Sequence, residues 1–401
     1  MPMSWALVAS LLLAAAGYIF GRSRAFAAAG SDIRLLHSRP TYHGANVALA
    51  TLLPPIIIMS LASVLRMAGV IGTGAGPVVG LIALGTAVAG LGWGVTRIGQ
   101  QFRARNVVEK IILGILIFCS SIAIATTVGI VLSLIFETGR FFQLHSWQDF
   151  LFGTQFAPRP EGISRLGMLP LLWGTLYISF IALLFAVPIG LLAAIYLSEY
   201  ASPRMRGIAK PVVEVLAGIP TIVYGLFALV TVGPMLRDYF AQPLGLGTSA
   251  SSVMTAGLVM GIMLIPFVSS LSDDIINAVP QSLRDGALGL GSTPSETVRQ
   301  VVLPAALPGI VGAILLAASR AIGETMIVVL GAGAAATMSL NPFEAMTTIT
   351  VKIVGQLTGD NDFSSPEMLV AFALGLTLFV ITLGLNVIAL YIVRKYREQY
   401  E

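Results

Sequence analysis

Nine long runs of apolar residues follow one another along this 401-residue chain. They lie at residues 4–20, 44–65, 77–96, 111–136, 167–197, 211–235, 252–271, 305–332 and 367–393. Each is long enough to cross the roughly 30 Å hydrocarbon core of a bilayer as a helix. Apolar and polar residues do not alternate within the runs, so a β-barrel is excluded. With 56% hydrophobic and 10% charged residues, the chain is predicted to be an all-α polytopic membrane protein.

The basic residues between these runs are divided unevenly between the two sides of the membrane. Sixteen lie in one set of alternate loops and six in the other. The first set is Arg22, Arg24, Arg34, Arg39, Arg97, Arg103, Arg105, Lys110, Arg204, Arg206, Lys210, Arg284, Arg299, Arg394, Lys395 and Arg397. The second set is Arg66, Arg140, Arg159, Arg165, Arg237 and Lys352. Because cytoplasmic loops are rich in Lys and Arg, the first set is predicted to be cytoplasmic, with the N-terminus outside and the C-terminus inside.

A polar stretch at residues 97–110 separates three N-terminal runs from the six that follow. Residues 1–110 are therefore predicted to be a three-helix membrane extension, and residues 111–401 a six-helix core. No basic residue precedes the first run, so we expect a retained helix rather than a cleaved signal peptide. Cys119 stands alone and the histidines lack zinc-ligand spacing, so no disulfide, metal or cofactor is predicted.

Residues 280–304 carry the turn chemistry of two short helices joined by a bend. Pro280 can open the first helix, and Gly289 with Gly291 can end it. Thr293 and Glu296 then match a capping box, which starts the second helix. We expect a rigid unit that a moving partner can push, the alternative being an ordinary connection with good caps.

Two charged residues, Arg320 and Glu324, interrupt the eighth apolar run. At about 1.5 Å per residue from Leu307, Arg320 lies roughly 20 Å along the helix, near mid-membrane. An arginine at that depth costs about 2.5–3.5 kcal/mol on insertion scales, so it needs a cavity or a partner charge. Residues four apart share a helical face, so Glu324 is the expected partner. Arg320 could bind a tetrahedral oxyanion, or the two could be a purely structural pair.

Pro220 interrupts the sixth run and has glycines on both sides, at Gly218 and Gly225. A proline breaks a membrane helix and frees a backbone carbonyl, and glycines allow helices to approach closely. Gly218, Pro220 and the nearby Tyr224 are therefore candidates for a bend or gate. Simple close packing of helices explains the pattern equally well.

The spacing within the loop at 272–304 resembles the EAA coupling loop of ABC-type import permeases. The matching residues are Asp285, Gly286, Ala287, Gly291, Leu303 and Pro304. The family usually has Glu and Ala at the first two of these positions. In an exposed helix, glycine costs about 1 kcal/mol relative to alanine. The resemblance implies that a separate ATPase binds this loop and powers transport.

Three further segments resemble the PstC family of phosphate-specific ABC permeases. They are residues 174–200 (GTLYISFIALLFAVPIGLLAAIYLSEY), 216–229 (LAGIPTIVYGLFAL) and 319–326 (SRAIGETM). The resemblance covers about residues 111–401 and implies that Arg320 and Glu324 line a path for inorganic phosphate through the inner membrane. It also implies three kinds of partner: a PstA-like second permease, a PstB-like ATPase dimer and a periplasmic PstS-like phosphate-binding protein.

Two alternatives remain open. One arginine does not choose among tetrahedral anions, so the cargo could be sulfate or molybdate. The chain could also be an autonomous secondary transporter or channel, in which Arg320 and Glu324 relay protons or anions. The EAA-like loop argues against this alternative. The sequence contains no G-x-x-x-x-G-K-[ST] phosphate loop, so the chain is not expected to hydrolyse ATP itself.

Overall fold

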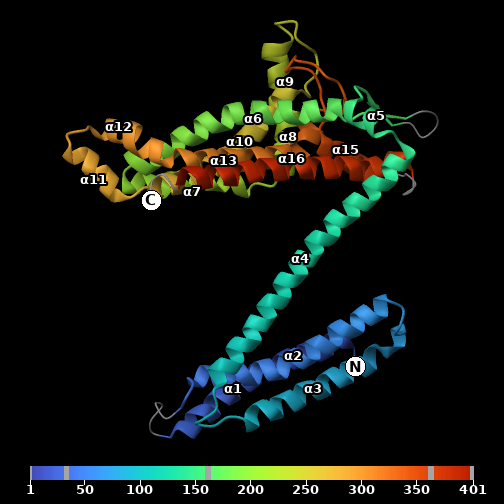
Figure 1. The fold of residues 1–401 in the computed structure, drawn as a ribbon, viewed down its shortest axis with the longest axis vertical. Helices are drawn as coiled ribbons and strands as arrows, with labels where there is room; N and C mark the ends of the chain where they lie inside the picture. The colour runs from blue at the N-terminus through green and yellow to red at the C-terminus, as the bar shows by residue number, and fades with distance from the viewer. Residues whose placement is uncertain (1, 31–35, 159–163, 360–364, 398–401) are drawn as a thin grey trace. The chain divides into compact units, whose positions relative to one another are not determined.

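A computed structural model describes residues 2–30, 36–158, 164–359 and 365–397. Among these residues, nine helices are long and apolar enough to cross a membrane, so the chain is an all-helical polytopic membrane protein. Contacts divide it into two compact units, Met1–Val128 and Gly129–Glu401, and each is described by itself (Figure 1). Arg34 and Arg159, used above for the predicted orientation, lie outside the described residues.

The N-terminal unit is a bundle of three helices joined to the start of a fourth. The elements are α1 (Met3–Ala29), α2 (Pro40–Met67), the short η2 (Thr73–Ala75), α3 (Gly76–Thr96) and the first part of α4 (Ala104–Leu144). Small residues let the helices approach closely. A Cβ on Gly90 would lie 2.0 Å from the carbonyl oxygen of Ala50, and one on Gly44 would lie 2.6 Å from that of Tyr18. Without a hydrophobic driving force between helices in lipid, such contacts are what hold membrane helices together.

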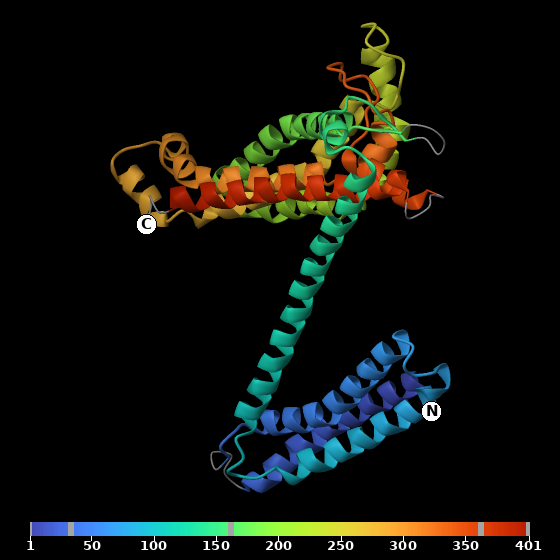
Figure 2. The ribbon, with the colours of Figure 1, turned by 45° about the vertical axis from the view of Figure 1, so that its right-hand side comes forward.

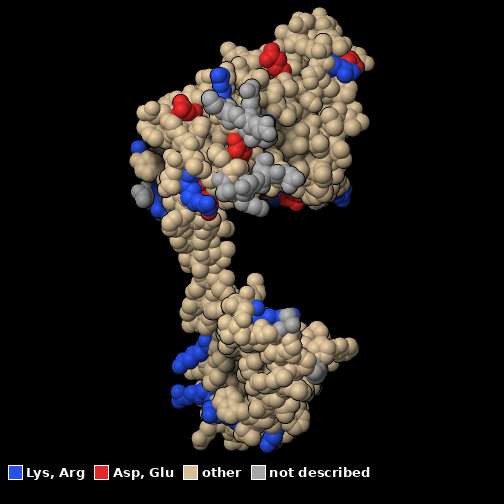
Figure 3. Space-filling view, turned by 90° about the vertical axis from the view of Figure 1, so that its right-hand side faces the viewer, with Lys and Arg blue, Asp and Glu red and all other residues tan. Residues whose placement is uncertain are grey.

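Helix α4 is a single helix of 41 residues that contains the whole of the predicted span at 111–136. No proline interrupts it. The side chains of its apolar stretch are exposed, and none in the 18-residue membrane window is buried. Between Lys110 and Glu137 the helix carries no charged residue, and Figure 3 shows this stretch without blue or red atoms. Such a surface fits hydrocarbon.

The second unit contains the remaining membrane helices. Its first elements are the end of α4, α5 (Trp147–Phe152), β1 (Phe156–Ala157), β2 (Arg165–Leu166), α6 (Leu169–Ile195), η3 (Tyr196–Tyr200) and α7 (Pro203–Gly218). These are followed by α8 (Thr221–Phe227), η4 (Ala228–Val232), α9 (Gly233–Leu236), η5 (Arg237–Ala241), α10 (Val253–Ala278), α11 (Gln281–Gly289) and α12 (Pro294–Thr297). The last are η6 (Val298–Val302), α13 (Leu303–Ile322), α14 (Met326–Gly331), α15 (Ile349–Thr358) and α16 (Pro366–Arg397).

Four long helices, α6, α10, α13 and α16, run side by side in this unit (Figures 1 and 2). Helices α11 and α12 lie at one end of them, and α5 and α15 at the other. The core lies between α6, α8, α10 and α14, where Ile178, Met260, Leu264 and Ile327 are fully buried. The β1 and β2 strands pair antiparallel, with Phe156 opposite Leu166.

Two of the predicted spans differ from the helices observed. A single helix was predicted at 211–235, but α7 ends at Gly218 and a separate helical stretch runs over Thr221–Ala241. A single helix was also predicted at 305–332, but α13 ends at Ile322 and residues 323–325 are not helical. Hydropathy does not detect these breaks because the residues on both sides of each are apolar.

Candidate functional site

The loop that follows α10 folds as a helix, a bend and a second helix. Residues 272–278 of the predicted loop belong to α10, and α11 begins directly after Pro280. Gly291 ends this helix with a φ of 92°, and its amide donates to the carbonyl of Leu288 at 3.0 Å. The amide of Ser292 donates to the carbonyl of Ala287 at 3.2 Å. This is a Schellman motif, whose left-handed residue is ordinarily glycine.

Helix α12 begins with a capping box. The Thr293 hydroxyl accepts a hydrogen bond from the Glu296 amide at 3.3 Å, and the Glu296 carboxylate accepts one from the Thr293 amide at 2.8 Å. The chain continues without a break through η6 into α13, which starts with Leu303 and Pro304. A force on α12 therefore reaches a membrane helix through continuous helical backbone.

Helix α11 presents a surface that its own chain does not cover. None of its residues is buried, and Leu290 just after it is 91% exposed. Asp285 and Gly286 are exposed, and Ala287 is half-buried. The Asp285 carboxylate accepts a hydrogen bond from the side-chain amide of Gln281 at 3.1 Å. Exposed apolar side chains beside an acidic group are typical of a protein-binding surface.

A cavity of about 480 Å³ lies where α7, α10 and α13 meet. Its lining includes Glu214, Ala217, Phe267, Ser270, Leu316 and Arg320. The Arg320 guanidinium carbon lies 4.2 Å from the centroid of the Phe267 ring, a cation–π contact. Stacking on the ring leaves the N–H groups at the edge of the guanidinium available as donors. Arg320 is exposed, so this cavity can offer a positively charged fork to an anion.

The predicted pairing of Arg320 with Glu324 is wrong. Because α13 ends at Ile322, the two residues do not share a helical face, and no ion pair joins these two described side chains. The Glu324 carboxylate instead accepts hydrogen bonds from the amides of Met326 at 3.0 Å and Ile327 at 3.4 Å. The carboxylate therefore caps the first turn of α14, whose amides have no hydrogen-bond partner within the helix.

The chain breaks between α7 and α8, at the site predicted for a bend or gate. Helix α7 ends at Gly218, Pro220 is extended with a φ of −56° and a ψ of 136°, and α8 follows. The Tyr224 hydroxyl donates to the carbonyl of Leu216 at 2.8 Å and so satisfies a carbonyl in the last turn of α7. The break directly follows Ala217, which lines the Arg320 cavity. Gly218 and Pro220 thus lie at the break itself, and Tyr224 holds the start of α8 to the end of α7.

Of the residues that line the cavity, only Arg320 was predicted from the sequence; those not predicted include Glu214, Phe267 and Ser270. Glu214 lies within the apolar run predicted at 211–235, so the rule that charges in membrane segments are functional could have selected it. Phe267 and Ser270 give no such signal, because an aromatic residue or a serine in a membrane helix is ordinary. They belong to the site only because α10 packs beside α13.

Comparison with protein families gives two matches. Residues 186–398 match the family described as "binding-protein-dependent transport system inner membrane component". Residues 7–73 match a family described as "phosphate ATP-binding cassette transporter". The first match covers more than half of the chain and includes the loop, the cavity and the break. The second falls within the N-terminal bundle.

Curated relatives and solved structures show similar proteins. A phosphate transport system permease protein PstC from Mesorhizobium japonicum is 34% identical over 279 residues, 62% of this chain and 81% of that protein. PstC 1 from Mycobacterium tuberculosis is 37% identical over 245 residues, 57% of this chain and 72% of that protein. A crystal structure of a bacterial alginate ABC transporter aligns over 73% of this chain and 95% of the matched chain, with 18% identity and a TM-score of 0.49. The chain therefore belongs to the inner membrane components of binding-protein-dependent transport systems, and within them to the PstC-like phosphate ABC transporter permeases.

Proposed function

We propose that this chain is one of two permease subunits in an importer that carries inorganic phosphate into the cell, and that Arg320 contacts the anion on its way. As a member of its family it is the membrane subunit and not the ATPase. The observation that carries the proposal is an exposed arginine, stacked on Phe267, in a cavity next to a broken helix. A weakly held guanidinium fork in a membrane cavity is suited to a tetrahedral oxyanion that must bind and leave.

The proposed partners are a PstA-like permease, a dimer of PstB-like ATPases and a periplasmic PstS-like phosphate-binding protein. The uncovered surface of α11 supports an ATPase partner, since none of that helix's residues is buried. The exposed Arg320 supports a second permease that closes the other side of the cavity.

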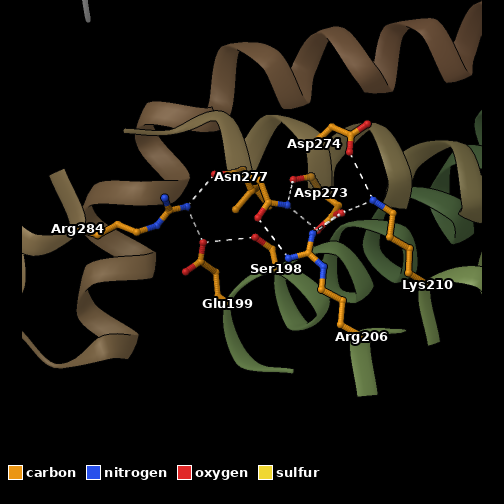
Figure 4. Close-up of polar contacts among 9 residues, drawn as sticks. Ser198, Glu199, Arg206, Lys210, Asp273, Asp274, Asn277 and Arg284 are labelled. Carbon is orange, nitrogen blue, oxygen red and sulfur yellow. Dashed lines mark hydrogen bonds and ion pairs between the residues drawn. The ribbon is translucent and has the colours of Figure 1, made fainter. Parts of the chain in front are cut away.

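We propose that α11 and the C-terminus are cytoplasmic and the N-terminus is outside. The end of α16 and the coupling helices α11 and α12 lie at the same end of the second unit (Figures 1 and 2). Two basic residues of the richer set lie at that end: Arg284 is in α11, and Arg206 donates to Asn277 near the end of α10 (Figure 4). Their charge favours the cytoplasmic side.

Purification from native membranes in mild detergent tests the partnership. We expect a tagged chain to carry with it an ATPase and a second, different permease in a 1:2 ratio of this chain to ATPase. Recovery of the chain alone or as a homo-oligomer, in detergent that preserves the complex of a known ABC importer, would contradict the proposal.

We propose further that residues 1–110 are an added membrane unit and that residues 111–401 form the permease core. A chain that begins near Arg105 keeps nearly all of α4 and loses few contacts, among them the hydrogen bond from the Arg105 amide to Ser38 at 3.2 Å. It is expected to insert and to assemble with the partners. A chain that begins at Gly129 keeps only 16 residues of α4, too few to span, and should assemble poorly. Loss of insertion in the longer chain, measured by membrane extraction, would show that the N-terminal unit belongs to the core.

A further inference from the structure

A buried carboxylate binds α7 to α10 near the coupling loop. Asp273 of α10 is 1% exposed, and its carboxylate accepts hydrogen bonds from Arg206 at 3.0 Å and Lys210 at 2.8 Å, both on α7 (Figure 4). The Asn277 side chain donates to it as well, at 2.9 Å. The hydrogen bond to Asp273 raises the pKa of Lys210, so the amine stays charged. A buried charge held by two cations and an amide is costly to separate from any one of them.

A second ion pair binds the coupling helix to the membrane helices. Arg284, in α11, donates to the Glu199 carboxylate at 2.8 Å, and each side chain is 13% exposed. Arg284 also donates to the carbonyls of Ile276 and Val279, each at 2.8 Å, at the end of α10. Glu199 lies in η3, which continues α6. One side chain therefore joins α11 to two long helices and donates to two carbonyls at the end of α10.

The two clusters share one turn of α10. Asp273 contacts α7, and Ile276 contacts Arg284. The two residues are three apart in α10 and are therefore neighbours on the helix surface. On α7, Lys210 is four residues before Glu214, and Glu214 lines the Arg320 cavity. The end of α10 therefore connects the coupling helix to the helix that forms one wall of the cavity.

We propose that Arg284, Glu199 and the Asp273 cluster form one positioning network that makes α7 follow the coupling helix when the ATPase moves it. This inference rests on the proposed function and names the residues that would carry the motion from α11 to the cavity. The network residues do not contact the anion. They would determine how much transport each ATP produces, rather than whether the anion binds.

The ratio of phosphate imported to ATP hydrolysed, in the complete complex reconstituted into liposomes, tests the network. Arg284→Gln and Asp273→Asn are each expected to leave ATP hydrolysis largely intact and to lower this ratio at least about tenfold, a loss typical of contacting groups that act together. If the clusters are one network, the double variant should be no worse than the more affected single variant. Arg284→Lys, which keeps the charge but cannot reach Glu199 and both carbonyls together, should give an intermediate ratio.

The matched control is Arg105→Gln, which removes an exposed ion pair with Glu109 in α4 (2.6 Å) and should leave the ratio unchanged. Two results would overturn the inference. One is that uptake and hydrolysis fall together, as expected if these contacts only stabilise the fold. The other is that the effects of the two substitutions multiply. A variant that fails to assemble is replaced by Glu199→Gln, which leaves the two carbonyl bonds of Arg284 in place and should lower the ratio in the same way. If the parent complex itself imports no phosphate, the proposed function fails and not the network alone.

Discussion

Replacing Arg320 by alanine is expected to reduce phosphate uptake at least about 100-fold, the loss typical when one preorganised donor to an anion is removed. Assembly should survive, because Arg320 is exposed and its one described contact is the stacking on Phe267. Arg320→Lys should restore little, since a point charge does not reproduce the planar fork of donors. Uptake of labelled phosphate by the complete complex in liposomes, with the amount of co-purified partners measured alongside, gives both quantities.

Arg97→Ala is the matched control for this substitution. Arg97 also stacks on an aromatic ring, with its guanidinium carbon 4.4 Å from the ring centroid of Trp93, but it lies in the N-terminal unit. Its loss should leave uptake near the parent level. Uptake near the parent level by Arg320→Ala would contradict a contact between Arg320 and the anion.

Glu324 is expected to act through α14 and not by pairing with Arg320. Glu324→Gln keeps a carbonyl oxygen that can accept from Met326 and Ile327, so assembly and much of the uptake should remain. Glu324→Ala removes this cap, which typically costs about 1 kcal/mol, and should lower uptake more. Equal loss with both substitutions would instead favour a role for the negative charge itself on the phosphate path.

Substitution of Gly291 by valine is expected to separate the permease from its ATPase while the membrane fold survives. The backbone there has a φ of 92°, which costs a β-branched residue about 1–3 kcal/mol. No atom lies within 4 Å of the added Cβ, so the effect is a change in the direction of the bend and not a clash. Asp285→Lys, which reverses the charge on the exposed face of α11, should have the same outcome. The measurement is the amount of ATPase that co-purifies with the tagged chain.

Gly69→Val serves as the control for the backbone strain. Gly69 has a φ of 73° and no atom within 4 Å of an added Cβ, but it follows α2 in the N-terminal unit. It should lose stability without losing the ATPase. Normal ATPase recovery and uptake in both Gly291→Val and Asp285→Lys would refute the coupling role of α11.

The coupling loop could be predicted closely because its signals are local. Each signal fixes the backbone only within a few residues of itself. The structure has the expected helix start after Pro280, the helix end at Gly291, and the capping box of Thr293 and Glu296. The number of spans was predicted correctly for a similar reason, since length and hydropathy decide whether a helix can cross a membrane. The bounds of the sixth and eighth spans were wrong, because each predicted run contains a break.

The cavity could not be predicted, because it depends on which helices pack together. Nothing near Phe267 in the sequence indicates that Arg320 stacks on it, since the two are 53 residues apart on different helices. The pairing of Arg320 with Glu324 failed for a related reason. Four-residue spacing implies a shared face only where the helix is continuous, and α13 ends at Ile322, between the two residues.

ATP-driven uptake into liposomes that contain this chain, its second permease and its ATPases, with the binding protein outside, shows whether the chain is the permease of a phosphate importer. We expect labelled phosphate to accumulate only when ATP and the binding protein are present, excess sulfate not to compete, and Arg320→Ala to abolish accumulation. Uptake that persists without ATP, or that is driven by an ion gradient through the purified chain alone, would contradict this expectation.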